Sequence, residues 1–208
     1  MPTPENFWNK AAAKYSRRPI KDMAAYEATL ERVRAHLRPT DAVLELGCGT
    51  GGTALALAPS AGHVTGVDIS SEMIRIATEK GEGAANVSFE KADLESGALG
   101  DTRYDVVMAF NLLHLIEDLP GALRRIHEHV APGGLFISKT PCLSHFGLLV
   151  KIMIPVMRAV GRAPFVGYLK TDEVEAMIRA TGFEIVETGD YPASSHSRFV
   201  VAKRTDPA

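Results

Sequence analysis

The chain has few of the residues that mark several protein classes. Of its 208 residues, two are cysteine and one is tryptophan. Cys48 and Cys142 are too few for a disulfide framework or a cysteine-rich zinc site, so a reducing, cytoplasmic environment is expected. The N-terminal residues show no basic segment followed by an apolar core, and a secretory signal is therefore not expected.

An excess of charge of one sign is also absent. The formal net charge is −2. Such a chain has no broad electrostatic attraction to phosphate backbones, so nucleic acid is not an expected partner. Because 46% of the residues are apolar and 23% are charged, we expect one substantial core and a single globular domain over residues 1–208.

Long hydrophobic runs are missing too. The most apolar stretch, residues 146–157, is interrupted by Lys151 and Pro155, whereas a transmembrane helix needs about 20 predominantly apolar residues. Three interpretations stay open for this stretch: a core-packing helix pair, a wall of an apolar substrate pocket, or contact with a membrane surface. Met153 and Met157, four residues apart, would suit an adaptable apolar wall.

The most informative segment that is present is the run from Val43 to Gly51. An apolar strand leads here into alternating glycines, Gly47, Gly49 and Gly51. Glycine adopts positive φ and has no Cβ, so a ligand can come close to main-chain amides at such a turn. The segment therefore predicts a cofactor-binding loop.

Acidic residues follow two further predicted strands. Asp68 ends the run from His63, and Asp93 comes shortly after the run from Val87. A carboxylate placed after a βα unit suits hydrogen bonding to a ribose diol. The spacing G-x-G-x-G, preceded by Glu45, differs from the dinucleotide pattern G-x-G-x-x-G, although Gly52 leaves some ambiguity. A nicotinamide-dependent oxidoreductase is the first alternative.

These segments resemble those of the class I S-adenosylmethionine-dependent methyltransferases of the small-molecule type. The segment ELGCGTG resembles the family's first motif, GVDIS its ribose-binding segment and ADLE its adenine-binding segment. YDVVMAFNLLHLIED resembles the fourth strand and the exit toward the active site. The resemblance covers roughly residues 40–203 and implies methyl transfer from S-adenosylmethionine, with S-adenosylhomocysteine as the product.

The resemblance also implies roles for individual residues. The glycine turn would line the methionine and ribose side, Asp68 would hold the ribose, and Asn111 would offer its main-chain carbonyl near the sulfonium. Glu45 would orient the turn or reach the amino group through water. The complete set of predicted cofactor residues is Tyr15, Glu45, Gly47, Cys48, Gly49, Gly51, Asp68, Ile69, Met73, Asp93, Leu94 and Asn111.

Hydrophobic periodicity predicts an α/β chain. A helix is expected over residues 22–37, and strands are expected over residues 42–46, 63–67, 87–91, 105–110, 134–139, 183–188 and 198–202. The resemblance implies a Rossmann-like, doubly wound, seven-stranded sheet, mostly parallel with an antiparallel last strand. We divide the chain into an N-terminal helical lid (1–39), a cofactor-binding core (40–140), a substrate-side helical insert (141–170), and a C-terminal helix with an edge hairpin (171–208).

Three aromatic residues precede the first predicted strand: Trp8, Tyr15 and Tyr26. In similar small methyltransferases this segment folds over the cofactor as a lid, and Tyr15 is the preferred lid contact. Large aromatic side chains are usually buried, so Trp8 and Tyr26 are expected to pack on a face of the sheet.

His114 is the candidate catalytic residue because it lies just past the fourth predicted strand, where open α/β sheets bind ligands. It either accepts a proton from the acceptor or shapes the pocket. Asn111 begins Asn-Leu-Leu-His rather than the Asn-Pro-Pro-aromatic signature of amide and base methyltransferases, so a small, partly apolar or lipid-like acceptor is expected. We predict no metal and a monomer or homodimer, while a non-catalytic binding module remains a second alternative.

Overall fold

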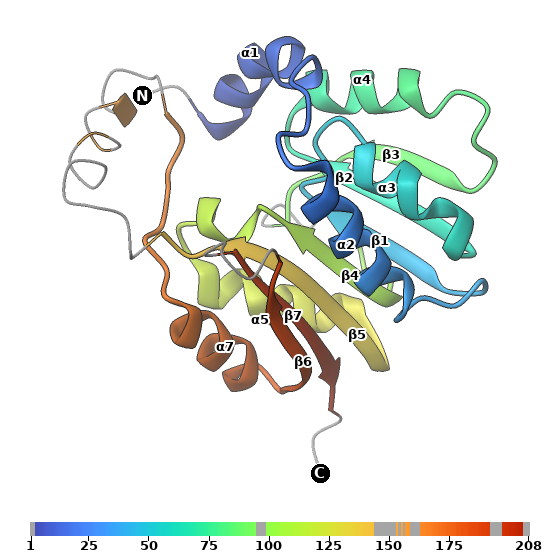
Figure 1. Cartoon of the computed structure of the whole chain (residues 1–208), viewed down its shortest axis with the longest axis vertical. Helices are drawn as coiled ribbons and strands as arrows, with labels where there is room; N and C mark the ends of the chain where they lie inside the picture. The colour runs from blue at the N-terminus through green and yellow to red at the C-terminus, as the bar shows by residue number, and fades with distance from the viewer. Residues whose placement is uncertain are drawn as a thin grey trace.

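The chain forms one seven-stranded sheet with helices on both faces (Figure 1). The computed structural model describes residues 3–94, 99–143, 163–191 and 197–205, together with residues 153, 155, 157 and 158. Much of the predicted insert, including residues 144–152, lies outside the described residues.

Two helices precede the first strand, and helices then separate the first strand from the second, the second from the third and the fourth from the fifth. The strands are β1 (Ala42–Leu46), β2 (His63–Asp68), β3 (Val87–Lys91), β4 (Tyr104–Phe110), β5 (Val130–Pro141), β6 (Phe183–Asp190) and β7 (Ser197–Arg204). The α-helices with described bounds are α1 (Pro4–Ser16), α2 (Met23–Arg34), α3 (Gly52–Leu57), α4 (Ser71–Lys80), α5 (Leu119–His129) and α7 (Thr171–Ala180). The described 3₁₀ helices are η1 (Ala58–Ser60) and η2 (Leu113–Leu115).

The strand order is β3-β2-β1-β4-β5-β7-β6. The first five strands are parallel to one another, and β7 runs antiparallel between β5 and β6. The predicted fold class is therefore confirmed. The order reverses between β1 and β4, and open α/β sheets bind ligands outside the carboxyl ends of the strands at such a switch point.

Each face of the sheet carries its own hydrophobic core. One core joins α2 and α3 to alternate residues of the central strands, among them Val43, Met108 and Ile137. The other core joins α5 and α7 to the strand residues that point to the opposite face of the sheet, among them Leu44 and Phe136. Because successive strand side chains point to opposite faces, a run of buried residues can serve both cores. Tyr26 packs against the first core, as predicted.

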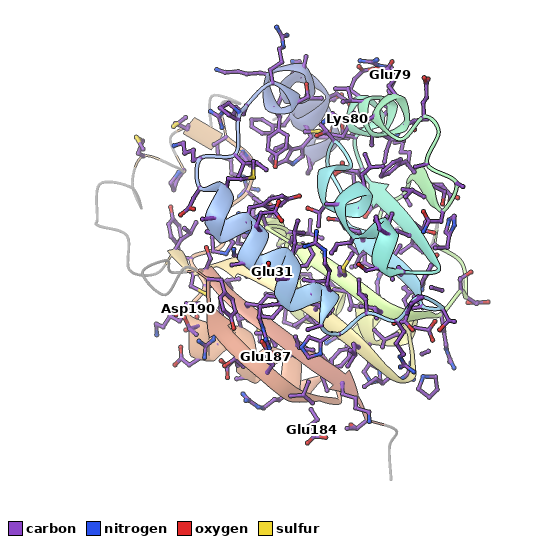
Figure 2. The ribbon with its side chains drawn as sticks, turned by 45° about the vertical axis from the view of Figure 1, so that its right-hand side comes forward. Glu31, Glu79, Lys80, Glu184, Glu187 and Asp190 are labelled. Atoms are coloured by element: carbon purple, nitrogen blue, oxygen red, sulfur yellow. The ribbon has the colours of Figure 1, made fainter. Side chains whose placement is uncertain are left out.

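An ion-pair network fixes α2 to the far edge of the sheet. The Glu187 carboxylate of β6 accepts hydrogen bonds from Arg32 Nε at 2.8 Å and from Arg32 Nη2, and it lies 2.8 Å from His36 Nε2. Figure 2 shows Glu187 beside α2, with Glu184 farther along the same strand. Although burial disfavours its charged form, the contacts with Arg32 and His36 lower the pKa of Glu187. The network therefore holds α2 across the strands that end at the site.

The predicted helix over residues 22–37 is too long, because α2 ends at Arg34. The chain then tightens into turns in which the His36 amide donates to the Val33 carbonyl at 2.9 Å and the Leu37 amide donates to the Arg34 carbonyl at 3.2 Å. Such three-residue hydrogen bonds commonly close the last turn of a helix. Apolar periodicity alone does not distinguish this turn from a further helical turn.

Candidate active site

The glycine turn has the backbone geometry that the sequence predicts. Gly47, Gly49 and Gly51 have φ angles of +64°, +54° and +76°. A Cβ at Gly51 would lie 2.7 Å from Phe89 Cζ, so this glycine is required for packing as well as for conformation. A Cβ at Gly49 would meet only Tyr15 Cε1, at 3.8 Å. The turn is therefore closely packed at Gly51, whereas there is open space beside the backbone at Gly49.

Asp68 lies at the end of β2, directly beside this turn. Its Oδ2 accepts a hydrogen bond from the Gly49 amide at 3.0 Å, and its Oδ1 accepts one from the Ser70 amide at 2.8 Å. Burial raises the pKa of Asp68, and these two hydrogen bonds oppose that shift. Each carboxylate oxygen retains a second lone pair, so the fixed carboxylate can still accept from a ligand hydroxyl.

Glu45 lies beneath the turn and is 3% exposed. It accepts a hydrogen bond from the Ala54 amide, yet its Oε2 has no hydrogen-bond partner among the described residues. Burial, and to a smaller extent the charge of Asp68, raises the pKa of Glu45 to about 8. A buried oxygen without a donor carries a desolvation cost that a ligand donor such as an ammonium group would relieve.

This raised pKa predicts a pH-dependent stability. Above the ordinary glutamate pKa the unfolded chain ionises at Glu45 while the folded chain stays protonated, so the contribution of Glu45 to stability falls as the pH rises toward about 8. We therefore expect Glu45→Gln to melt higher than the parent at pH 9 and to melt nearly the same at pH 4. Scanning calorimetry at both pH values tests this, with exposed Glu184→Gln as the matched control. An equal difference at both pH values would contradict the prediction.

The predicted adenine-side residues occupy different depths. Ile69 and Asp93 are partly buried after β2 and β3, and Leu94 packs against the core on the α5 side. The Leu94 carbonyl accepts a hydrogen bond from Arg125 Nη1 at 3.1 Å. Met73 is 2% exposed and packs with residues of α1. The parallel register brings the ends of β1, β2 and β3 to one edge, so these residues share the side of the sheet that carries Asp68.

Tyr15 lies over the glycine turn, as the position of its ring above Gly49 indicates. It is 47% exposed. Desolvation and the nearby charges of Asp68 and Glu45 raise the pKa of its phenol. The phenol is therefore a neutral hydrogen-bond donor at pH 7. The structure brings together the predicted lid contact and the predicted cofactor loop.

Trp8 does not pack on the sheet, which corrects the prediction. It packs instead with Ala12, Met73 and Ile76, between α1 and α4. The reason is the path of α1, which lies along α4 beyond the carboxyl edge of the sheet (Figure 1). A tryptophan on that helix can reach α4 but not the face of the sheet.

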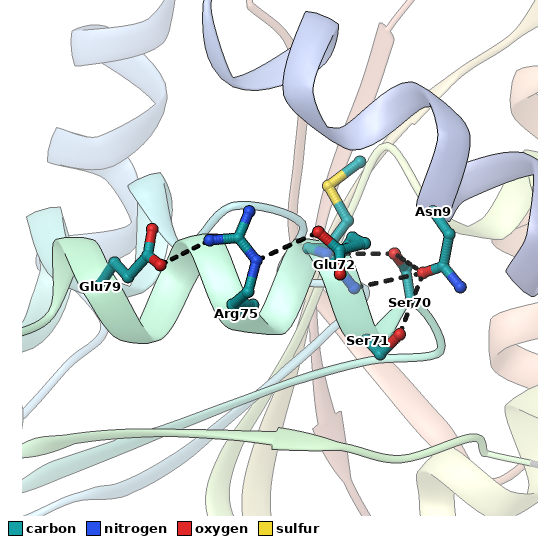
Figure 3. Close-up of polar contacts among 7 residues, drawn as sticks. Asn9, Ser70, Ser71, Glu72, Arg75 and Glu79 are labelled. Carbon is teal, nitrogen blue, oxygen red and sulfur yellow. Dashed lines mark hydrogen bonds and ion pairs between the residues drawn. The ribbon is translucent and has the colours of Figure 1, made fainter.

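Asn9 connects α1 to the segment that follows Asp68. Its Oδ1 accepts hydrogen bonds from Ser70 Oγ at 2.7 Å, from the Glu72 amide at 3.2 Å and from Ser71 Oγ at 3.4 Å (Figure 3). Ser70 is fully buried, and its hydroxyl also accepts from the Met73 amide at the start of α4. One amide oxygen thus ties α1 to the residue whose amide hydrogen-bonds Asp68. Sequence reasoning missed Asn9 because no local pattern distinguishes it.

We expect Asn9→Ala to loosen α1 from α4. The substitution leaves the Ser70 hydroxyl and the Glu72 amide without their acceptor, and an unsatisfied buried group costs about 1–3 kcal/mol. Hydrogen exchange of the α1 amides should accelerate while exchange in the central strands stays unchanged. Asn9→Asp keeps the accepting oxygen and should exchange like the parent. Unchanged exchange in Asn9→Ala would show that the other contacts of α1, the packing of Trp8 and the ion pair of Glu5 with Lys91, are enough to hold the helix.

The end of β4 supplies Asn111 and, two residues later, the turn η2 with His114. Asn111 has a φ of +54° and is the one non-glycine residue with positive φ in the described ranges. Its amide donates to the Lys139 carbonyl at 2.8 Å. His114 Nδ1 is buried and has no hydrogen-bond partner among the described residues, and burial lowers the pKa of His114 to about 4. The imidazole is therefore neutral at pH 7.

A small pocket opens where β4 and β5 end. Its lining comes from α2, from the start of α3 and from the two strand ends: Tyr26, Thr29, Leu30, Thr53, Phe110, Asn111 and Lys139. Lys139 Nζ donates to Thr29 Oγ1 at 2.8 Å inside this lining. Neither Thr29 nor Lys139 was among the predicted site residues. A lysine within an apolar strand was the available signal.

Cys48 is buried within the glycine turn, and burial raises the pKa of its thiol. It therefore serves the turn as a small apolar residue rather than as a nucleophile. In the described part of the chain, no group of three histidine, cysteine or acidic side chains could hold a metal ion. Within the same residues, no helix combines the length and the apolar character needed to cross a bilayer.

A glycine turn after β1, an acid at the end of β2 and a seven-stranded sheet whose penultimate strand in spatial order is antiparallel define the class I methyltransferase fold. The sequence model of a family described as a methyltransferase domain matches residues 43–134. Over this segment, which is less than half of its length, the chain is similar to methyltransferases, and its fold is that of the class I enzymes. This match supports the predicted family, and the strand order confirms the predicted fold class.

Part of the chain is similar in sequence to named methyltransferases. Phosphoethanolamine N-methyltransferase 1 of Arabidopsis thaliana is 34% identical over 121 residues, which are 57% of this chain and 25% of that protein. The chain thus spans about a quarter of the length of this curated relative.

Solved structures share the fold over nearly the whole chain. The DhpI complex with S-adenosylhomocysteine superposes with a TM-score of 0.77 at 24% identity and covers 97% of this chain and 95% of that one. Magnesium protoporphyrin IX methyltransferase of Synechocystis PCC 6803, with bound S-adenosylhomocysteine, gives 0.70 at 21% identity and covers 97% and 98%.

Proposed function

We propose that this chain transfers the methyl group of S-adenosylmethionine to a small, partly apolar acceptor. The observation that carries the proposal is the Asp68 carboxylate, fixed by the Gly49 and Ser70 amides beside a glycine turn that is open at Gly49. These groups fit the cofactor, because a ribose diol needs a fixed acceptor and the adjoining chain needs close approach to the backbone. When bound, the cofactor supplies an activated methyl group on a sulfonium.

The residues of the chain bind and orient in this proposal. Asp68 accepts from the ribose hydroxyls, and the partnerless oxygen of Glu45 accepts from the amino group, directly or through water. Ile69 and Met73 border the adenine, and Asp93 with Leu94 meets its exocyclic amine. Tyr15 covers the turn from α1 and excludes water from it.

Holding the acceptor in line with the methyl group supplies much of the acceleration, since proximity and orientation replace a bimolecular encounter. His114 stands near the acceptor side, and we propose that it shapes the pocket and accepts a proton only weakly. A base is most effective when its pKa lies near the working pH, whereas burial holds the pKa of His114 at about 4.

The pocket at the ends of β4 and β5 is the proposed site of the acceptor. Phe110 and Leu30 give the pocket an apolar wall, and Met153 of the insert is 52% exposed. We place the substrate-side insert at residues 141–170 and the lid at residues 1–39. We further propose that the protein works in the cytoplasm as a monomer or homodimer, consistent with its free cysteines. The named relatives act on phosphoethanolamine and on magnesium protoporphyrin IX, so the fold accepts acceptors of different sizes.

Calorimetric titration and a transfer assay test this proposal together. We expect the purified chain to bind S-adenosylhomocysteine at micromolar concentration and not to bind NADH. Labelled methyl from S-adenosylmethionine should then appear on a member of an acceptor panel that includes phosphoethanolamine and detergent-dispersed lipids. Preference for NADH would favour the oxidoreductase alternative. Binding without transfer to any panel member would favour a binding module.

A further inference from the structure

Lys139 is an unusual residue in its surroundings. It lies in β5 between the fully buried Ser138 and Thr140, and its side chain lines the pocket at the ends of β4 and β5. No carboxylate among the described residues lies within ion-pair distance of its Nζ. Burying a cation without an ion-pair partner costs free energy, and such cations often belong to functional sites.

The hydrogen bonds of Lys139 leave donors free for a ligand. Its Nζ donates to Thr29 Oγ1 at 2.8 Å, and the Thr29 hydroxyl donates in turn to the Ala25 carbonyl at 2.8 Å. Thr29 thus accepts one ammonium proton and holds Nζ at a fixed place. An ammonium group has three donors, so two remain for the pocket.

Lys139 carries the only formal charge among the described residues that line the pocket. Burial lowers the pKa of Lys139, and Asp22 at the start of α2 opposes that shift. The Asp22 carboxylate is itself engaged by the Ala25 amide at 2.9 Å. The other polar residues of the lining, Tyr26, Thr53 and Asn111, carry no formal charge.

The position in the sheet separates Lys139 from the three acidic residues that are predicted to bind the cofactor. Glu45, Asp68 and Asp93 lie at or just after the ends of β1, β2 and β3, whereas Lys139 lies on β5, beyond β4. Neighbouring strands lie about 4.8 Å apart, so β5 is about 10 Å from β1. Asn111, whose amide is bonded to the Lys139 carbonyl, stands between the two sides. An anion on Lys139 would thus lie on the acceptor side of the methyl group.

We propose that Lys139 binds an anionic group of the methyl acceptor, a phosphate or a carboxylate, and that Thr29 positions its ammonium group. The inference rests on the proposed function, because it places the acceptor in this pocket. It narrows the acceptor to a small molecule with an acidic group beside an apolar part, since Leu30 and Phe110 form the rest of the wall.

Calorimetric titration with inorganic phosphate, acetate and phosphoethanolamine tests the subsite, with and without saturating S-adenosylhomocysteine. We expect the parent chain to bind at least one of these probes and Lys139→Met to weaken that binding at least about tenfold, because charge-assisted hydrogen bonds are lost. Lys139→Arg should retain it within about threefold, as a cation is kept. Lys203→Met is the matched control. Lys203 is an exposed lysine of β7 that lies opposite Leu135 in the strand register, near the other end of β5.

Two further variants test the positioning role of Thr29. Thr29→Val removes the oxygen that accepts from Lys139 and should weaken probe binding by a few fold, whereas Thr29→Ser keeps the oxygen and should restore it. Thermal melting shows that each variant folds.

The possible results separate the subsite from the proposed function. Equal probe binding by Lys139→Met and the parent, or no probe binding by the parent, overturns the subsite. Loss of S-adenosylhomocysteine affinity in Lys139→Met, with probe binding retained, assigns Lys139 to the carboxylate of the cofactor and also overturns it. Failure of the parent to bind S-adenosylhomocysteine contradicts the proposed function alone, and the titrations without it then decide on the subsite.

Discussion

Replacing Asp68 with alanine should lower the affinity for S-adenosylhomocysteine at least about 100-fold. The variant loses the carboxylate that accepts from the Gly49 and Ser70 amides, so the glycine turn loses its anchor to the end of β2. The ligand also loses its acceptor for the ribose diol. Hydrogen bonds to a charged group contribute about 1.5–3 kcal/mol each, and about 2.8 kcal/mol corresponds to 100-fold in affinity.

Thermal melting with and without ligand measures this effect. Ligand at about 100 times its dissociation constant stabilises the folded chain by about 2.7 kcal/mol. For a domain of this size each 1 kcal/mol raises the melting temperature by about 2–4 °C, so the parent should gain about 5–11 °C. Asp68→Ala should gain almost nothing at the same ligand concentration.

Two control variants make the result specific to Asp68. His114→Ala removes a partly buried side chain on the acceptor side of the site, and Glu184→Ala removes an exposed carboxylate on β6. Both should keep nearly the full ligand-induced shift. If the ligand raises the melting temperature of Asp68→Ala as much as that of the parent, the cofactor does not use this carboxylate. If His114→Ala loses the ligand-induced shift as Asp68→Ala does, the placement of His114 on the acceptor side is wrong.

The parts of the molecule that the sequence predicts are those set by local pattern. The strands read as apolar runs because both faces of this sheet are covered, and β1 and β3 have the predicted bounds. Alternating glycines predict a turn with positive φ because other residues are strained there, and Gly47, Gly49 and Gly51 all adopt it. Position after a strand is enough to bring Asp68 to the same edge.

The parts that the sequence does not predict depend on contacts between distant segments. Asn9 acts through Ser70, which lies 61 residues away, and Lys139 is held by Thr29, which lies 110 residues away. The sequence around Asn9 and around Lys139 does not predict these partners. The same limitation explains the error for Trp8: its burial follows from composition, but the surface that buries it depends on where α1 lies.

The burial of His114 is a further example, with a chemical consequence. Its place after β4 follows from the sequence, and this place suggested a general base with a pKa near neutrality. In the fold, Nδ1 is buried without a partner among the described residues, and the pKa falls to about 4. Position in the sequence thus predicts proximity to the site but not the solvation that sets the pKa.

The adjacent residues Gly51 and Gly52 allow a direct test of why the turn needs glycine. Gly51 has a φ of +76°, and a Cβ there would lie 2.7 Å from Phe89 Cζ and 3.0 Å from Ala77 Cβ. Left-handed backbone costs an alanine about 1–2 kcal/mol, and overpacking costs about 1–3 kcal/mol. Gly51→Ala should therefore lower the free energy of unfolding by about 2–5 kcal/mol, measured by urea denaturation.

Gly52 is the matched control, because a Cβ there has no heavy atom within 4 Å and the residue already lies in α3. Gly52→Ala should be neutral or should stabilise the chain by about 0.4–1 kcal/mol, since it restricts the unfolded state. The two contributions at Gly51 can then be separated in a Phe89→Leu background, which removes the ring from the position of the clash. If Gly51→Ala costs about 1–2 kcal/mol less there than in the parent, packing contributes and the remainder is backbone strain. An equal cost in both backgrounds would assign the whole effect to the left-handed backbone, and no cost in the parent would contradict the geometry of the glycine turn.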